Sequence, residues 1–421
     1  MSEAQFASWL REAYPNPALP IAIAFSGGGD SLALLLLTLR HAGGRPVYAL
    51  SVDHALQEGS AGQIAKAAQQ AEALGAISHQ FYWHHGQITS GVQEAARKAR
   101  YGLMGAFCRE HEISSLVVAH SRDDQAETLW MRKQCGGGWR AMAGMSAESY
   151  APVWPQLRDI TLLRPLLNWS RESLRDVCRQ AGQLWHDDPS NQDLNYLRVQ
   201  ARQALAGDTV LAGSLLEEGA AMRARREAEQ AEALTQLREI TLSGCGSAHI
   251  SGDAILNEVA MARLLMCVSG HSQMADMARV RALHDAMGEP GYVSQTLGGC
   301  VIERMDGGFG VARETGRWLK QQQPEPLPAH SPSVFDGRFE ITATDKGLTI
   351  APLWLARDQL DTSEKSALHR YGAQARRGLF GIFKGETLIA APQIGRGETK
   401  WRSLVSSRLY QERQGTGVNP A

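Results

Sequence analysis

The chain has 421 residues, of which 43% are hydrophobic and 21% charged, and its formal net charge is −1. This composition is close to the globular average, so it excludes disorder, a fibrous repeat and a small disulfide-stapled scaffold. At roughly 150 residues per domain, the length predicts two or three domains, each able to bury its own core.

Signals for a membrane or for export are missing from the sequence. The longest apolar run, Leu32–Leu37, is far shorter than the roughly 18 residues of a membrane span, and we interpret it as a buried helix. The first 19 residues contain acidic residues and prolines but no basic segment followed by an apolar core, unlike a signal peptide. We therefore expect a cytoplasmic protein with no membrane partner.

The cysteines are spread over the chain, and none forms a C-x-x-C pair. This spacing argues against a zinc or iron–sulfur site built from neighbouring thiolates. For a cytoplasmic protein we expect reduced, mostly buried thiols. The six residues are Cys108, Cys135, Cys178, Cys245, Cys267 and Cys300.

Residues 20 to 120 alternate short β-rich runs with longer amphipathic patterns. The expected strands are Ile21–Phe25, Val47–Val52, Ser78–Trp83 and Ser115–Ala119, and the expected helices are Ser31–His41, Gly62–Leu74 and Gly91–Glu112. This alternation predicts an α/β fold with a doubly wound parallel sheet. Ligands of such sheets bind at the carboxyl ends of the strands, so the loops after these strands are the first candidates for a site.

The composition changes from about residue 206 onward. Leu215–Leu237 is typical of a long connector helix, and helical patterning continues through Met261–Met287. The Pro-rich tract Gln323–Pro332 is typical of a linker or an extended crossing, and Phe335–Gln393 of a β-rich module. We therefore expect three domains. These are a catalytic domain at 1–205, a helical connector at 206–290 and a β-rich domain at 291–421.

The strongest local signal is a buried strand, a glycine-rich turn and a helix. The turn reads Ser26-Gly27-Gly28-Gly29-Asp30-Ser31, and we name it the phosphate loop. Glycines let backbone amides approach an anion, and the helix N-terminus adds unpaired N–H donors and a favourable dipole. Ser26 and Ser31 can donate hydroxyl protons, and Asp30 can hold the Mg²⁺ that accompanies a triphosphate.

The Walker pattern of enzymes that work at the γ-phosphate does not occur in the chain. The phosphate loop instead resembles the PP-loop of ATP pyrophosphatases, which bind the β and γ phosphates as leaving pyrophosphate and pass AMP to an acceptor. A chance glycine-rich turn would not be expected to carry both serines and the aspartate.

Two further sets of side chains belong to this sheet. Asp53 and His54 end the second strand, where they could contact adenine or ribose or merely cap the strand. Arg97 and Arg100 lie three residues apart, hence on one side of a helix. Either arginine could neutralise phosphate charge in a transition state, although a solvated helix face has the same pattern.

A third set follows the fourth strand. His120, Asp123, Asp124 and Glu127 crowd the opening turns of a helix. Carboxylates in a first turn often serve only to complement the helix dipole. Their position at the carboxyl edge of the sheet favours a functional role here.

Together these motifs resemble the tRNA(Ile)-lysidine synthase family over roughly the first 205 residues. The resemblance is carried in chain order by the phosphate loop, Asp53-His54, Arg97 with Arg100 and Tyr101, His120–Glu127, the turn Gly136–Gly138, Arg164–Leu167, Asp188–Asn191, and Arg198 with Arg202. The chain departs from the family at Val199, where Asn is common. It departs again at Cys135–Trp139, which replaces a more basic turn and puts a local tRNA contact in doubt.

The resemblance implies a ligase that attaches free L-lysine to C2 of the wobble cytidine in the CAU anticodon of tRNA(Ile). It implies ATP and Mg²⁺ as cofactors, an adenylated tRNA intermediate, and AMP and pyrophosphate as products. By analogy, Asp30 and Asp124 would hold Mg²⁺ or the reacting groups, Arg100 would stabilise the α-phosphate, and His120 would assist adenylation. Asp124 or Glu127 could bind the lysine ammonium and accept its proton.

The expected contacts to lysine or tRNA come from the same motifs and from two basic residues that could replace the missing basic turn. They are Arg97, Asp123, Asp124, Glu127, Arg132, Lys133, Arg198 and Arg202. Beyond residue 210 the likeness is weaker, and we transfer no individual contacts there.

Three other functions stay open on the sequence. The first is a tRNA thiolase, which also adenylates a base. The lack of a C-x-x-C pair argues against this function, whereas Cys135, which we expect next to the site, favours it. The second is a small-molecule synthetase, which has the same phosphate loop but would be expected to lack a basic second half that binds tRNA. A tRNA-binding protein without catalysis is the third alternative, and the sequence does not indicate an oligomeric state.

Overall fold

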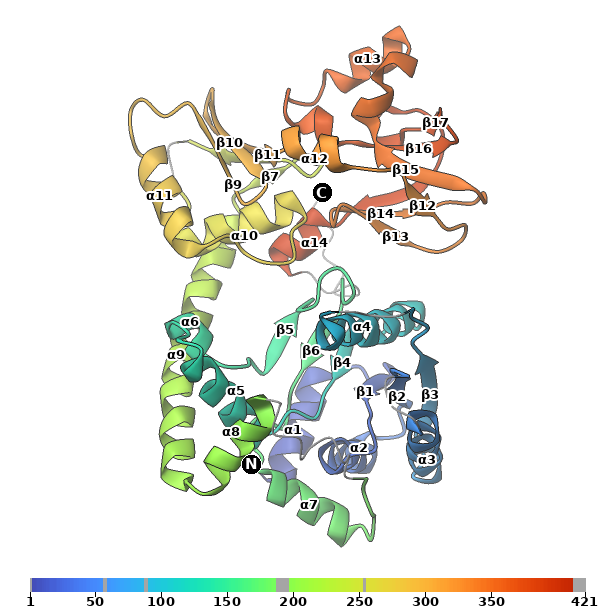
Figure 1. Ribbon diagram of the computed structural model, residues 1–421, viewed down its shortest axis with the longest axis vertical. Coiled ribbons are helices and arrows are strands. Elements are labelled where there is room, and N and C mark those ends of the chain that lie inside the picture. Colours follow the sequence, from blue (N-terminus) through green and yellow to red (C-terminus); the bar gives the residue numbers. More distant parts are fainter. Residues whose placement is uncertain (1, 56–58, 87–89, 187–196, 253–254, 412–421) are drawn as a thin grey trace. The chain divides into compact units, whose positions relative to one another are not determined.

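The computed structural model in Figure 1 describes residues 2–55, 59–86, 90–186, 197–252 and 255–411. The chain forms two compact units, which divide between Ala228 and Glu229. We describe each unit by itself. The division into three domains at 205/206 and 290/291 stays a prediction.

Unit 1 is built on a six-stranded sheet with the order β3-β2-β1-β4-β6-β5. Five strands are parallel and β5 is an antiparallel edge strand, so the expected α/β fold is confirmed with one addition. The strands are β1 (Ile21–Ala24), β2 (Val47–Asp53), β3 (Ile77–Tyr82), β4 (Ser115–Val117), β5 (Glu148–Tyr150) and β6 (Thr161–Leu163). Strands β5 and β6, each three residues long, were not predicted from the sequence.

The strand order reverses direction next to β1. The chain proceeds from β1 to β2 and β3 on one side, and then returns to place β4 on the other side of β1. Such a reversal opens a crevice at the carboxyl ends of the two strands, because their connections leave toward opposite faces of the sheet. The phosphate loop after β1 and the His120 segment after β4 therefore meet at one edge of the sheet (Figure 1).

Side chains of β1 alternate between two apolar cores, as expected for a strand buried on both faces. Ile21 and Ile23 pack with α1 (Glu3–Ala13), α2 (Gly29–His41), α3 (Ser60–Ala73) and α7 (Arg171–Gln180) on one face. On the other face Ala22 packs with α4 (Val92–Glu110). The run Leu32–Leu37 lies within α2 and is buried throughout, which confirms the prediction of a buried helix.

Four more α-helices lie in the described part of the first unit, and the last of them continues past residue 228. They are α5 (Arg122–Gln134), α6 (Trp139–Met142), α8 (Leu197–Ala206) and α9 (Thr209–Leu237). Leu129, Met142 and Leu215 form a small buried cluster that joins α5, α6 and α9. The expected connector helix is thus present and begins earlier than predicted.

Unit 2 contains three antiparallel sheets, with the orders β7-β8-β11-β10-β9, β12-β15-β16-β17 and β13-β14-β18. The strands are β7 (Thr241–Leu242), β8 (Ala248–Ser251), β9 (Ser294–Leu297), β10 (Cys300–Met305), β11 (Gly308–Arg313), β12 (Glu325–Leu327), β13 (Ser333–Phe335), β14 (Phe339–Thr342), β15 (Leu348–Pro352), β16 (Phe380–Lys384), β17 (Thr387–Ala390) and β18 (Lys400–Ser403). The helices are α10 (Glu258–Ser269), α11 (Met277–Met287), α12 (Gly316–Gln321), α13 (Thr362–Leu368) and α14 (Val405–Tyr410). The first sheet combines strands from both sides of the predicted boundary at 290/291.

Two expectations for this half are corrected by the structure. The helical segment Met261–Met287 is two helices, because Gly270 takes a left-handed conformation (φ +75°) that ends α10. The tract Gln323–Pro332, expected as a linker or a crossing, contains β12, which pairs with β15 and belongs to a sheet.

All six cysteines are free, and all but Cys135 are buried, so the expectation of mostly buried thiols is confirmed. No helix among the described residues is both long enough and apolar enough to cross a bilayer.

Gly105 and Gly102 form a matched pair for testing how α4 packs. A Cβ on Gly105 would collide with the backbone carbonyl of Gln156, whereas one on Gly102 would only touch the Gln156 side chain, at 3.5 Å. Alanine is a better helix former than glycine by about 1 kcal/mol. We therefore expect Gly102→Ala to raise the free energy of unfolding by up to that amount. Gly105→Ala should lower it by about 1–3 kcal/mol through overpacking.

Urea unfolding of both variants beside the unchanged protein measures the difference. Equal changes at the two positions would contradict the close packing of α4 on the Gln156 backbone.

Candidate active site

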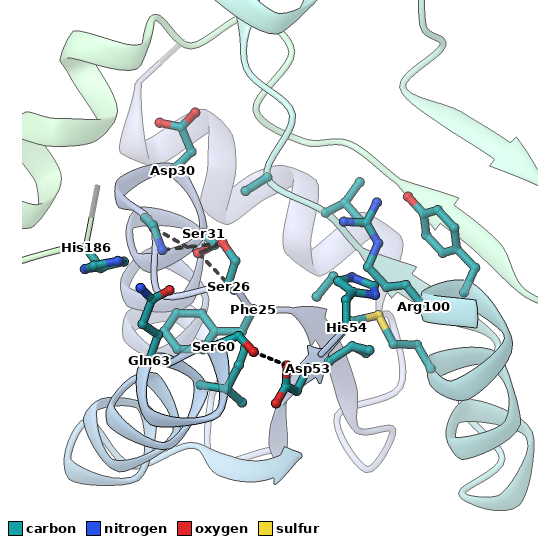
Figure 2. A pocket seen from close by; sticks show the side chains of 18 of the residues that line it. Phe25, Ser26, Asp30, Ser31, Asp53, His54, Ser60, Gln63, Arg100 and His186 are labelled. Carbon is teal, nitrogen blue, oxygen red and sulfur yellow. Dashed lines mark hydrogen bonds between the residues drawn. The ribbon is translucent and has the colours of Figure 1, made fainter. Parts of the chain in front are cut away.

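A cavity of about 570 Å³ lies at the carboxyl ends of β1, β2 and β4 (Figure 2). Side chains from α3 and α4 complete its wall. The predicted site residues that line it are Ser26, Gly28, Asp30, Ser31, Asp53, His54, Arg100 and His120. The structure therefore brings together residues from four separate segments of the sequence.

The phosphate loop is organised by its own two serines. Ser31 Oγ donates to the carbonyl of Gly28 at 2.8 Å and lies 3.1 Å from Ser26 Oγ. Gly28 is the residue that precedes α2, so the first amides of this helix lie at the cavity wall. A helix N-terminus presents unpaired N–H groups and favours negative charge, which makes this loop suited to bind phosphate.

Two glycines of the loop are closely packed by their surroundings. Gly27 has φ +77°, and a Cβ there would lie 2.8 Å from the Cβ of Ala67 on α3. A Cβ on Gly29 would meet the indole of Trp185 at 3.3 Å. Gly27 thus needs the space and the conformational freedom that only glycine provides, whereas a larger residue at position 29 would require the Trp185 ring to shift slightly.

Asp53 serves first to hold the turn after β2. Its Oδ1 accepts hydrogen bonds from the Ala55 amide at 2.8 Å and from Ser60 Oγ at 2.7 Å, the latter drawn in Figure 2. Its neighbour His54 lines the cavity, and Nδ1 of that ring is buried with no hydrogen-bond partner among the described residues. Burial and the nearby Arg100 guanidinium hold the pKa of His54 below its ordinary value, so the ring is neutral.

Two arginines of α4 lie against the buried ring of Tyr101. The guanidinium carbons of Arg97 and Arg100 lie 4.9 and 5.1 Å from the ring centre of Tyr101. Arg100 reaches the cavity wall, whereas Arg97 is not among its lining residues. Of the two, Arg100 is therefore the arginine placed to meet a phosphate in the cavity.

His120 follows β4 in the chain and forms part of the cavity wall. Burial lowers the pKa of its imidazole to about 4, and the charges of Arg164 and Arg198 act in the same direction. Its Nδ1 is also buried without a partner among the described residues. The ring is therefore neutral near pH 7 and has an unused hydrogen-bonding nitrogen at the cavity.

Asp124 is held in the first turn of α5 by hydrogen bonds on both oxygens. Its Oδ2 accepts from the amide and hydroxyl of Ser121, the helix cap, at 2.8 and 3.0 Å. Its Oδ1 accepts from Arg198 at 2.7 Å and from Arg171 at 3.2 Å. Burial alone would raise the pKa of Asp124, but Arg198 and the Ser121 amide outweigh it, so the pKa is lowered and the group is ionised.

Glu127 is surrounded by three guanidinium groups although it is only 2% exposed. It accepts from Arg171 at 3.0 Å, from Arg198 at 2.9 Å and from Arg202 at 3.0 Å. A buried carboxylate is tolerable only when it is paired in this way. Arg198 and Arg202, expected as substrate contacts, are thus directed at the carboxylates of α5.

Arg171 is a site residue that the sequence analysis missed. Its backbone N–H donates to Asp123 Oδ2 at 2.8 Å, and its Nε lies 3.6 Å from Asp30 Oδ2. With its bonds to Asp124 and Glu127, it contacts all four carboxylates of the site. The sequence indicates only that Arg171 follows a serine that can cap a helix. It does not indicate the contacts with the carboxylates, because these lie far upstream in the chain.

Asp30 is the carboxylate whose charge is least compensated. Burial and the neighbouring Asp124 raise its pKa to about 6, although Arg171 opposes them. Asp30 and Asp124 converge on one guanidinium, and two carboxylates beside a phosphate loop suit Mg²⁺, which takes one or two carboxylates together with substrate phosphates. Among the described residues no group of three or more metal-ligating side chains is assembled, so a closed protein metal site is not indicated there.

The remaining predicted residues lie elsewhere. Arg132 donates to the Ala141 carbonyl, and Lys133 lies 3.5 Å from Glu218, both at the C-terminal end of α5. The prediction that Cys135 lies next to the site is wrong, because it ends α5 about 17 Å along the helix from Asp124. The segment 188–191 lies outside the described residues.

Comparison with known proteins covers nearly the whole chain. Residues 2–208 match a family model described as a PP-loop domain. The chain is 31% identical over 411 residues to a tRNA(Ile)-lysidine synthase of Caulobacter vibrioides, covering 94% of this chain and 93% of that protein. It is also 31% identical over 396 residues to that of Ruegeria pomeroyi, covering 90% of each. A solved U34-tRNA thiolase from Methanococcus maripaludis aligns with 53% of this chain and 77% of its own at 14% identity and a TM-score of 0.45.

The carboxylate cluster yields a pH-dependent prediction. Arg171→Met keeps an apolar stem of similar length but leaves Asp30 without its guanidinium neighbour. Removing that cation raises the pKa of Asp30 above its value of about 6, so the variant loses stability as the pH rises and Asp30 ionises. We expect the free energy of unfolding to fall by about 1–3 kcal/mol at pH 8 and by less at pH 5, measured by urea unfolding.

Arg175→Met is the matched control, because Arg175 lies on the same helix but pairs at 3.9 Å with Glu172, which is exposed. Its effect should stay within about 0.5 kcal/mol at both pH values. An Arg171→Met loss at pH 5 as large as that at pH 8 would contradict the proposed charge balance.

Proposed function

The chain belongs to the tRNA(Ile)-lysidine synthase family, a family of ligases, and on this premise we propose that it joins free L-lysine to C2 of the wobble cytidine in the CAU anticodon of tRNA(Ile). One observation carries the proposal. The N-terminus of α2, which suits phosphate, and a cluster of carboxylates share Asp30, so an activated base and an amine could meet there.

The first step converts a poor leaving group into a good one. The C2 oxygen of cytosine attacks the α-phosphate of ATP, the bond to the β-phosphate breaks, and pyrophosphate leaves. The amides of the phosphate loop suit the departing diphosphate, and Arg100 at the cavity wall can counter the charge that builds on the α-phosphate. His120 offers a neutral imidazole that can hydrogen-bond the base or the phosphate.

The second step needs an uncharged amine. Lysine arrives as a cation, so its ammonium must be bound and then deprotonated before nitrogen attacks C2 and AMP leaves. Asp124, with its lowered pKa, is better suited to bind the ammonium than to take its proton. Because guanidiniums already engage Asp124 and Glu127, lysine would have to share or replace one of them.

Mg²⁺ would be held by Asp30 and Asp124, and it would neutralise charge on the phosphates of ATP. The wobble cytosine would have to leave its stack to reach the cavity, which a single-stranded loop permits at modest cost.

The thiolase alternative needs a reactive thiolate near the cavity. Cys178 approaches the phosphate loop, with its Sγ 3.5 Å from the Gly29 carbonyl, but burial raises the pKa of this thiol to about 11. Cys135 lies at the far end of α5. Neither thiol favours sulfur transfer over lysine ligation.

The products test the proposed function. With an unmodified tRNA(Ile) transcript, ATP, Mg²⁺ and lysine, we expect nucleoside mass spectrometry to find lysidine in place of the wobble cytidine, and ATP to be split to AMP and pyrophosphate. Without lysine, or with uridine at the wobble position, no lysidine should form. Release of ADP, or a product independent of lysine, would overturn the proposal.

Asp124→Ala tests the carboxylate in the second step. We expect lysidine formation to slow about a hundredfold or more, since both ammonium binding and metal binding would be lost. Glu172→Gln, which removes an exposed carboxylate at the start of α7, should leave the rate unchanged. An Asp124→Ala enzyme that works at a near-normal rate would rule out the assigned role.

A further inference from the structure

The phosphate loop contains no lysine, arginine or histidine, and Asp30 adds a negative charge to it. A departing diphosphate carries several negative charges, and backbone amides supply only part of what it needs. Further donors must come from other parts of the fold.

Three cavities meet at the phosphate loop. Beside the main cavity, one of about 220 Å³ is lined by Lys66 and Gln63, and one of about 210 Å³ by Arg171 and Arg175. Ser26 and His186 are the two described residues that line all three. Both residues therefore lie where the three cavities adjoin.

The backbone around His186 is fastened to the loop independently of its imidazole. The His186 amide donates to the Gly27 carbonyl at 3.1 Å, and the Leu184 carbonyl accepts from Gln70 Nε2 at 2.7 Å. Trp185 covers Gly29. Residues 184–186 thus lie across the loop, and Figure 2 shows the His186 ring beside it, near Gln63.

The imidazole of His186 is available to bind a ligand. Neither ring nitrogen of His186 hydrogen-bonds to any residue that the structure describes, and the residue is exposed to the cavities. By contrast, Arg171 and Arg202, which line the same small cavity, are engaged by Asp124 and Glu127. A ring N–H of His186 is therefore a donor that a ligand of the loop can use without breaking a hydrogen bond to any residue that the structure describes.

We propose that His186 is a diphosphate-contacting residue, whose ring N–H donates to the β or γ phosphate of bound ATP and to the pyrophosphate that leaves. The inference rests on the proposed function only in taking the phosphate loop as the site of a triphosphate. It assigns a role to a residue that the motifs of the sequence did not single out.

Pyrophosphate exchange into ATP, with tRNA present and lysine omitted, isolates the step concerned. For His186→Ala we expect the pyrophosphate concentration at half-maximal exchange to rise about tenfold or more, as for loss of a hydrogen bond to a charged group. The KM for lysine in the complete reaction should not change. His186→Gln, which keeps an N–H donor, should recover part of the loss.

His84→Ala serves as control, because this exposed histidine lies outside all three cavities. The backbone bond from residue 186 to Gly27 survives each substitution, and unfolding curves of the variants check that the fold is kept. Unchanged pyrophosphate dependence in both His186 variants would overturn the proposal. An equal rise in the KM for lysine would also do so, since it would indicate general damage.

Direct binding separates this inference from the proposed function. If the unchanged protein shows no tRNA-dependent exchange, the proposed function fails. Calorimetric titration with Mg²⁺ and inorganic pyrophosphate then still tests His186. Binding weakened about tenfold in His186→Ala supports the contact, and equal binding by both proteins overturns it.

Discussion

The buried carboxylate of Glu127 is the constraint on which the arrangement of the site depends. Taking an ionised carboxylate out of water costs several kcal/mol unless cations and hydrogen bonds replace the lost solvation. Glu127 meets this requirement through three guanidiniums, one from the start of α7 and two from α8. Because Arg171 also contacts Asp30, this pairing ties α5, α7 and α8 to the phosphate loop.

The charged cluster and the main cavity differ in electrostatic character. Two of the histidines that line the cavity, His54 and His120, are neutral because burial lowers the pKa of each, and apolar residues form much of the remaining wall. The cluster holds four carboxylates and three guanidiniums. A planar, weakly charged nucleoside suits the first environment and a cationic amine the second, with the phosphate loop between them.

Local signals in the sequence were enough to predict the strands that build the site. The strand, glycine turn and helix around Ser26–Ser31 are encoded by neighbouring residues, and so is the capped turn that follows His120. Arg171 and His186 could not be found in this way, since only the folded chain brings α7 and the segment after it against the loop. The error at Cys135 has a similar cause. Cys135 comes soon after Asp124 in the sequence, but the two residues lie at opposite ends of α5 and are therefore far apart.

The charge balance of the cluster offers a reason for an aspartate in a loop that we propose to bind phosphate. Asp30, Asp123, Asp124 and Glu127 bring four negative charges, whereas Arg171, Arg198 and Arg202 bring three positive ones. The uncompensated charge falls on Asp30, whose pKa of about 6 shows that ionisation there is disfavoured. A cation that arrives with the substrates, whether Mg²⁺ or an ammonium, would relieve this imbalance and be bound more tightly for it. The aspartate would then help the loop to bind phosphate, because its charge would be used to hold the cation that the phosphates need.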